Sequence, residues 1–160
     1  MPTQSQKGEL FYNLHHRDHA FIIPNPWDVG SAKLLAHLGF EALATTSAGY
    51  AFSTGRPDGT LGREESIAHA AAIVAATDLP VSADLENGFG DDPESAAETI
   101  RQAAAAGLAG ASIEDVAGHG NSGPYDIGLA AERIRAAAEV VRGLPFRFTL
   151  TARAENYLVG

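Results

Sequence analysis

The chain has 160 residues and no cysteine, with a formal net charge of -9 at pH 7 and a sequence pI near 5.0. A chain of this length is expected to form one domain, here predicted to span residues 1–160. The lack of cysteine excludes disulfides, cysteine-bound zinc and a cysteine nucleophile within these residues. The acidic balance argues against nucleic acid or an anionic membrane as the main partner. It leaves room for a small anionic substrate, because nearby residues set the potential of a pocket.

The sequence contains no apolar run long enough to cross a bilayer. No apolar stretch follows the polar start of the chain at residues 1–6, so a secretory signal is not expected. These features predict a soluble cytoplasmic protein.

Short apolar runs alternate with stretches of helical composition along most of the chain. This alternation is typical of βαβ units around a parallel sheet, and the nearly continuous apolar runs are typical of strands buried on both faces. Strands are predicted at residues 20–23, 41–45, 79–85, 110–113 and 146–152, and helices at 6–18, 29–38, 63–77, 93–106 and 128–141.

Polar residues follow nearly every predicted strand, and this feature separates two possible architectures. An open doubly wound sheet concentrates its site at one switch point, whereas a (β/α)₈ barrel builds its site from the ends of several strands. We therefore expect an α/β chain of the TIM-barrel type. A full barrel takes about 200 residues or more, so only the first five βα units plus an N-terminal helix are expected here, as part of a longer protein.

The most informative segment is the predicted strand at 79–85 with the glycine-rich loop that follows it. It carries two carboxylates, Asp84 and Glu86, two residues apart. Residues i and i+2 of a strand lie on the same face, so both carboxylates can approach one point. Glu114 and Asp115 repeat this plan after the next strand. Hard oxygen ligands at strand ends suit a magnesium-type ion, and the pattern predicts a metal site here.

Six short motifs stand at or near the ends of predicted strands. They are PNPWD at 24–28, TSAG at 46–49, GRPDGTL at 55–61, DLENGFG at 84–90, IED at 113–115 and TARAE at 151–155. In this order and at these places, they resemble the isocitrate lyase / phosphoenolpyruvate mutase superfamily over residues 21–160.

The resemblance implies a barrel enzyme that depends on Mg²⁺, or on Mn²⁺ in its place, and that makes or breaks C–C or P–C bonds in small α-oxo or α-hydroxy acids. It implies metal binding, partly through waters, by Asp84, Glu86 and Glu114, with Asp58 in the outer shell. Full-length members form tetramers, so a homo-oligomer is expected of a full-length protein.

The resemblance also implies how the substrate is held. The carboxylate would be bound by backbone N–H groups and a hydroxyl at 47–49, and a second anionic group by an arginine. The residues implied are Ser47, Ala48 and Gly49, then Arg153 with Glu155, and Trp27 and Asp28 on the floor of the pocket. The residue types alone leave alternatives open: an ion pair of Arg153 with Glu155 or Glu114, an ordinary turn at Ser47, and simple packing of Trp27.

The segment after Glu114 departs from the pattern of the superfamily. Members specific for isocitrate or methylisocitrate carry a lid there with lysine and cysteine, which supplies a catalytic acid, whereas residues 116–123 read VAGHGNSG. This departure argues against those two activities. Asn121 is a counterpart of the lid asparagine of phosphonomutases and a candidate substrate contact. His119 is a candidate acid that could fold over the site, which gives a predicted catalytic set of Arg153, Ser47 and His119.

The residue types also suggest the chemical step. An α-oxo acid chelates Mg²⁺ through its carboxylate and the adjacent oxygen, and cleavage of the next C–C bond leaves an enolate whose charge a metal stabilises. The leading hypothesis is a Mg²⁺-dependent lyase of a small α-oxo or α-hydroxy dicarboxylic acid. The alternatives are a phosphonomutase, an oxaloacetate-type hydrolase or decarboxylase, and a non-catalytic barrel fragment.

Overall fold

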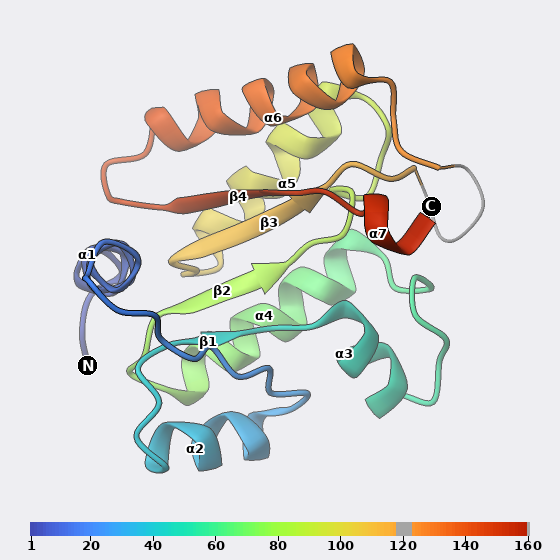
Figure 1. Ribbon diagram of the computed structural model, residues 1–160. Coiled ribbons are helices and arrows are strands. Elements are labelled where there is room, and N and C mark those ends of the chain that lie inside the picture. The colour runs from blue at the N-terminus through green and yellow to red at the C-terminus, as the bar shows by residue number, and fades with distance from the viewer. Residues whose placement is uncertain (118–122, 160) are drawn as a thin grey trace.

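A computed structural model describes residues 1–117 and 123–159 (Figure 1). In these residues, four parallel strands form one sheet in the order β1-β2-β3-β4, and helices precede and follow them. The strands are β1 (Leu43–Ala44), β2 (Val81–Asp84), β3 (Gly110–Glu114) and β4 (Thr149–Arg153). The helices are α1 (Gln4–His15), α2 (Val29–His37), α3 (Ser47–Ser53), α4 (Arg63–Ala76), α5 (Pro93–Ala105), α6 (Ile127–Arg142) and α7 (Asn156–Val159).

The predicted alternation of strands and helices in a parallel sheet is confirmed, with two corrections. The run at 20–23 is not a strand. It is non-helical chain beside β1, and the Ala44 N–H donates to the Pro24 carbonyl, 3.1 Å away. No helix was predicted after the TSAG motif, but α3 begins at Ser47, and the Thr46 side chain accepts the Gly49 N–H at 3.2 Å. A threonine that accepts such a bond is a favourable start for a helix.

The strand register decides which polar residues meet at one edge of the sheet. Asp84 of β2 pairs with Ser112 of β3, and Glu114 of β3 pairs with Arg153 of β4. All four strands point toward the side on which α3 and α7 lie, as Figure 1 shows. The carboxyl ends of the strands therefore meet at one edge, which is where barrel enzymes bind their substrates.

The apolar core fills the space between the sheet and the helices outside it. Ile100 of α5, Ile73 of α4 and Ile113 of β3 are each at most 1 % exposed. Helices α5 and α6 pack against each other beside β3 and β4. None of the helices in the described ranges combines the length and the apolar character that a membrane span requires.

Helix α1 lies at the opposite end of the strands from α3 and α7 (Figure 1). Its Phe11 and Leu14 are 2 % and 5 % exposed and pack with Ala42 and Ala109. The buried Lys7 donates to the Thr77 carbonyl at 2.7 Å. This helix covers the N-terminal ends of the strands and leaves the C-terminal ends for the site.

Candidate active site

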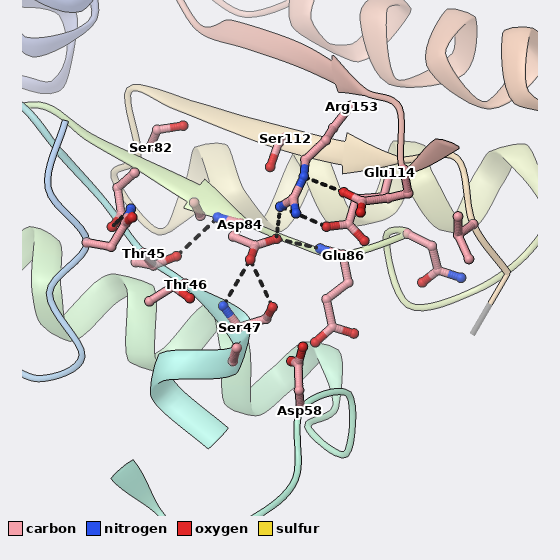
Figure 2. A pocket seen from close by; sticks show the side chains of 17 residues that line it. Thr45, Thr46, Ser47, Asp58, Ser82, Asp84, Glu86, Ser112, Glu114 and Arg153 are labelled. Atoms are coloured by element: carbon pink, nitrogen blue, oxygen red, sulfur yellow. Dashed lines mark hydrogen bonds and ion pairs between the residues drawn. The ribbon is translucent and has the colours of Figure 1, made fainter. Parts of the chain in front are cut away.

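A cavity of about 700 Å³ lies at the C-terminal ends of the strands (Figure 2). The ends of β1, β2, β3 and β4 all contribute side chains to it, together with the loop before α4. Of the described residues that line it, five are acidic and one is basic: Asp58, Asp84, Glu86, Glu114 and Glu155, and Arg153.

Arg153 stands among three carboxylates. Its guanidinium lies 2.5 Å from Glu155, 2.9 Å from Glu114 and 3.7 Å from Asp84. The first two contacts match the structural ion pairs that the residue types left open. The side chain of Arg153 is nevertheless 43 % exposed, so it is still accessible to a ligand from the open side of the cavity. Asp115 positions this group, since its Oδ1 accepts the Glu155 N–H at 2.9 Å.

Asp84 links three elements at the edge of the cavity. Its Oδ2 accepts the backbone N–H and the hydroxyl of Ser47, at 3.0 and 2.8 Å. Its own N–H donates to the Thr45 hydroxyl at 3.1 Å. A carboxylate at the first turn of a helix is favoured by the helix dipole. The Ser47 donors that were expected to hold a substrate carboxylate therefore bond to Asp84 in this structure.

Glu86 reaches the cavity from a turn and not from a strand. Strand β2 ends at Asp84, and Glu86 has a φ of +50°, in the left-handed region. Its N–H donates to Asp84 Oδ1 at 3.2 Å and its carbonyl accepts the Glu114 N–H at 2.8 Å. Such a conformation costs a non-glycine residue about 1–3 kcal/mol and persists where the surroundings impose it. The strand alternation invoked from the sequence does not apply, although both carboxylates line the cavity.

Burial and the excess of negative charge together change the protonation of Glu114. Its side chain is 17 % exposed. Burial, and then repulsion by Asp84, raise the pKa of Glu114 from 4.5 to about 7, against the opposing effect of Arg153. A carboxyl group with a pKa near 7 holds a proton part of the time at neutral pH, so it can give or take a proton. Because repulsion by Asp84 outweighs the attraction of Arg153, this arginine alone does not balance the carboxylates around Glu114.

The donor chemistry of the cavity fits a divalent cation bound largely through water. Within the described ranges, no group of three or more His, Cys, Asp or Glu side chains is arranged to hold a metal by direct contacts. Mg²⁺ usually keeps several waters and takes only one or two protein carboxylates. The surplus of carboxylates over cations supplies negative charge that such a hydrated cation would balance. Figure 2 shows the side chains of Glu86 and Asp58 extending toward the same part of the cavity.

Three residues expected at the substrate do not line this cavity. Asp28 caps α2, where its Oδ1 accepts the Ser31 N–H at 2.7 Å, and this bond lowers the pKa of the Asp28 carboxyl. Trp27 packs on Gly49, where an added Cβ would come within 2.4 Å of the indole ring. Trp27 also makes an edge contact with Phe52. The structure therefore gives Asp28, Trp27 and Gly49 local packing and capping contacts, while Ser47 and Ala48 stay at the cavity.

The proposed acid His119 and the lid residue Asn121 lie outside the described residues. Several other residues at the cavity were not predicted as site residues. A signal for two of them existed in the strand alternation, because Ser82 and Ser112 each stand two residues before a carboxylate on the same strand. The neutral polar residues that line the cavity without having been predicted are Asn25, Thr45, Thr46, Ser82, Asn87 and Ser112.

Comparison with known proteins identifies relatives by sequence and by overall structure. The chain is 38% identical over 96 residues to the 2,3-dimethylmalate lyase of Eubacterium barkeri, over 59% of this chain and 33% of the lyase. A crystal structure of a protein from Burkholderia cenocepacia J2315, provisionally named a lyase/mutase, superposes with a TM-score of 0.96 and 60% identity, over 98% of this chain and 57% of that one. Oxaloacetate acetylhydrolase in complex with oxalate superposes with a TM-score of 0.89 and 28% identity, over 99% and 56%.

The chain thus spans between about a third and three fifths of these proteins. The expected fold class, an α/β chain of the TIM-barrel type that forms part of a barrel, is confirmed. Superfamily members are lyases and mutases of small carboxylic acids and generally depend on a divalent metal. The family model of phosphoenolpyruvate phosphomutase matches residues 11–160, and this chain therefore belongs to the isocitrate lyase / phosphoenolpyruvate mutase superfamily, as its motifs predicted.

Proposed function

We propose that this chain carries the metal-binding part of the active site of a Mg²⁺-dependent lyase, which cleaves a C–C bond in a small α-oxo or α-hydroxy dicarboxylic acid. One observation carries the proposal: five carboxylates and a single arginine, among the described lining residues, face one cavity at the strand ends. We take residues 1–160 as one partial barrel domain, in a cytoplasmic protein that is oligomeric at full length.

The metal site that we propose consists of Asp84, Glu86 and Glu114, with Asp58 further out. These side chains come from separate elements, and all of them line the cavity. A bound Mg²⁺ or Mn²⁺ would neutralise part of their charge and act as a Lewis acid toward the negative charge that develops on the substrate. The raised pKa of Glu114 is consistent with this assignment, because burial and then repulsion by Asp84 disfavour its charged form, which a bound cation would stabilise.

Arg153 is proposed to bind the second anionic group of the substrate. Its planar guanidinium suits a carboxylate in a bidentate contact, and its side chain is 43 % exposed at the cavity. Its contacts with Glu114 and Glu155 hold it in place before a substrate arrives. A dicarboxylic acid would then be held at one end by Arg153 and at the other near Asp84 and Glu86.

Glu114 is proposed to bind the metal in its ionised form. Its raised pKa leaves it partly protonated at neutral pH in the metal-free protein, and a bound cation would favour the ionised carboxylate. Ser47 is proposed to act by holding Asp84, since both of its donors bond to that carboxylate. His119 remains the proposed acid, from the segment after Glu114.

The test is a comparison of substrates with the purified protein, with and without Mg²⁺. A lyase of the proposed class releases pyruvate or a related oxo acid from a four-carbon or branched dicarboxylic acid. The released oxo acid can be measured by its reduction in a coupled assay. Addition of EDTA should abolish the activity, and excess Mg²⁺ or Mn²⁺ should restore it. Activity that persists in EDTA would overturn the metal assignment.

Two other outcomes of the same assay would replace the proposed reaction. The likeness to oxaloacetate acetylhydrolase makes oxaloacetate hydrolysis, with release of oxalate and acetate, the second candidate. Turnover of a phosphonopyruvate-type compound would indicate a phosphonomutase instead. Absence of turnover together with absence of Mn²⁺ binding would favour a non-catalytic barrel part.

A further inference from the structure

The loop at residues 87–92 connects the cavity to a buried arginine on α6. This loop joins Glu86 to α5, and its Asn87 lines the cavity. Gly88 has a φ of +79°, and a Cβ added there would lie 3.1 Å from the Ala96 Cα. The path of the loop is therefore tightly constrained just after Glu86, which itself adopts a left-handed conformation.

Arg133 supplies hydrogen-bond donors to three carbonyls of this loop. Its Nη1 donates to Gly90 at 2.7 Å and to Asp92 at 3.3 Å, and its Nη2 donates to the Asn87 carbonyl. The residue is 1 % exposed. A buried guanidinium is tolerated when its N–H groups are satisfied, and its rigid fork can serve several acceptors at fixed positions. The three carbonyls thus converge on one cation.

Tyr125 holds the same loop through side chains. The Arg133 guanidinium lies over the Tyr125 ring, 4.5 Å from its centre. The Tyr125 hydroxyl donates to Asp91 at 2.7 Å and accepts the Asn87 amide N–H at 2.9 Å. Asn87 is consequently fixed at its carbonyl by Arg133 and at its side chain by Tyr125.

We propose that Arg133 is a positioning residue of the active site. By fixing the Asn87 carbonyl it sets the direction in which the chain leaves Glu86, and so places the Glu86 carboxylate and the Asn87 side chain at the cavity. The part of this inference that concerns metal binding rests on the proposed function. Other residues secure the neighbouring Gly88 carbonyl: Thr99 donates to it at 2.7 Å and Arg63 at 3.2 Å. Removal of Arg133 should therefore release the Asn87 peptide without unfolding the sheet.

The experiment compares Arg133→Met with Arg135→Met, a matched control on the exposed face of the same helix. Two quantities are measured for each folded protein: Mn²⁺ affinity, from the free-ion paramagnetic resonance signal, and amide hydrogen exchange of residues 86–92. Arg133→Met should weaken Mn²⁺ affinity by about 10- to 100-fold, the range seen when residues that support metal ligands are lost. Amide exchange of the loop should rise about tenfold or more. Arg135→Met should change neither quantity.

The two measurements distinguish a positioning role of Arg133 from a purely structural role. If Arg133→Met lowers only the thermal midpoint, with Mn²⁺ affinity and loop exchange equal to those of the control, the positioning role is overturned. If Arg133→Met does not fold, Arg133→Lys replaces it, because lysine keeps the charge but loses the fork. Arg133→Lys should bind Mn²⁺ more weakly than the wild type and show faster amide exchange at residues 86–92. Wild-type values of both quantities would overturn the proposal. If the wild type binds no Mn²⁺, the proposed function fails, and loop exchange alone decides whether Arg133 fixes the loop.

Discussion

The two ends of the sheet differ in what they bury. At the N-terminal ends of the strands, α1 buries Phe11 and Leu14 and covers the sheet with apolar contacts. At the C-terminal ends, five carboxylates of the described residues share a cavity with Arg153. Apolar burial stabilises a fold, whereas uncompensated charge destabilises it. The difference indicates that the N-terminal end of the sheet stabilises the fold, whereas the C-terminal end is destabilised by its charges and provides the binding site.

The polar groups at the two ends differ in the same way. Near α1, the amide of Gln4 donates to the carbonyls of Ala104 and Leu108, at 2.7 and 3.0 Å. Both partners of these two bonds are neutral, whereas the buried Lys7 of the same helix donates to the Thr77 carbonyl as a cation. At the other end the pKa of Glu114 is raised to about 7 by burial and by Asp84. Displaced pKa values of this kind are typical of functional sites.

The largest effect is expected from Phe11→Ala, which should weaken the stabilising end alone. Loss of a buried phenylalanine costs about 3–5 kcal/mol of unfolding free energy. Chemical denaturation should show this loss, while Mn²⁺ affinity of the protein that remains folded should be unchanged. Leu10→Ala is the control, because Leu10 lies on the same helix and is 44 % exposed; it should cost about 0.5 kcal/mol or less. A large loss of Mn²⁺ affinity in Phe11→Ala would contradict the separation of the two ends.

Asp84→Asn should weaken Mn²⁺ binding and turnover while leaving stability nearly unchanged, the reverse of Phe11→Ala. Asparagine can still accept the Ser47 N–H, so the start of α3 should persist, but the metal loses a charged ligand. We expect kcat/KM and Mn²⁺ affinity to fall by more than about 100-fold, beyond the loss caused by residues that only support ligands. The thermal midpoint should stay close to that of the wild type. Asp18→Asn, at an exposed position near the N-terminus and distant in sequence from Asp84, controls for the change of net charge. Wild-type turnover in Asp84→Asn would remove Asp84 from the site.

The sequence was sufficient to predict the residues placed by strand register. Asp84, Glu114 and Arg153 end neighbouring strands, so the parallel order alone brings them to one edge. The sequence was misleading at Asp28. A carboxylate three residues before Ser31 can equally cap a helix, and in the structure Asp28 makes this capping hydrogen bond and does not line the cavity.

Contacts between distant segments could not be predicted in this way. Arg133 lies on an amphipathic helix, where an arginine is usually exposed, and its burial depends on a loop more than forty residues earlier. The left-handed conformation of Glu86 likewise carries no signature in a pattern of apolar and polar residues. The run at 20–23 has the composition of a strand but continues into Pro24 and Pro26, which lack backbone N–H donors for a ladder.

The pH dependence of stability should distinguish the charged end of the sheet. The folded state raises the pKa of Glu114 to about 7 from 4.5, so between these values the folded protein binds more protons than the unfolded chain. The contribution of Glu114 to stability must therefore fall as pH rises through this window, whereas burial of His69, which lowers its pKa, has the opposite effect. In metal-free protein, we expect the Glu114 contribution to lower the thermal midpoint between about pH 5 and pH 8.

Glu114→Gln is the variant that isolates this effect. It removes the titrating group but keeps the shape of the side chain, so the drop in thermal midpoint should become smaller. If wild type and Glu114→Gln show the same pH profile in EDTA, the raised pKa of Glu114 does not contribute to stability. Addition of Mn²⁺ should also flatten the wild-type profile, because a bound cation favours the ionised carboxylate.

The smallest effect is expected from Lys7→Met, at the end that α1 covers. Burial lowers the pKa of Lys7, against the attraction of Asp78, so the charge of this lysine is a cost that its bond to the Thr77 carbonyl offsets. Methionine removes the bond and the cost together, and replacing a buried charge by an apolar group of similar size is often nearly neutral. The free energy of unfolding at pH 7 should change by less than about 1 kcal/mol. A loss comparable to that of Phe11→Ala would mean that this end of the sheet also depends on a charge.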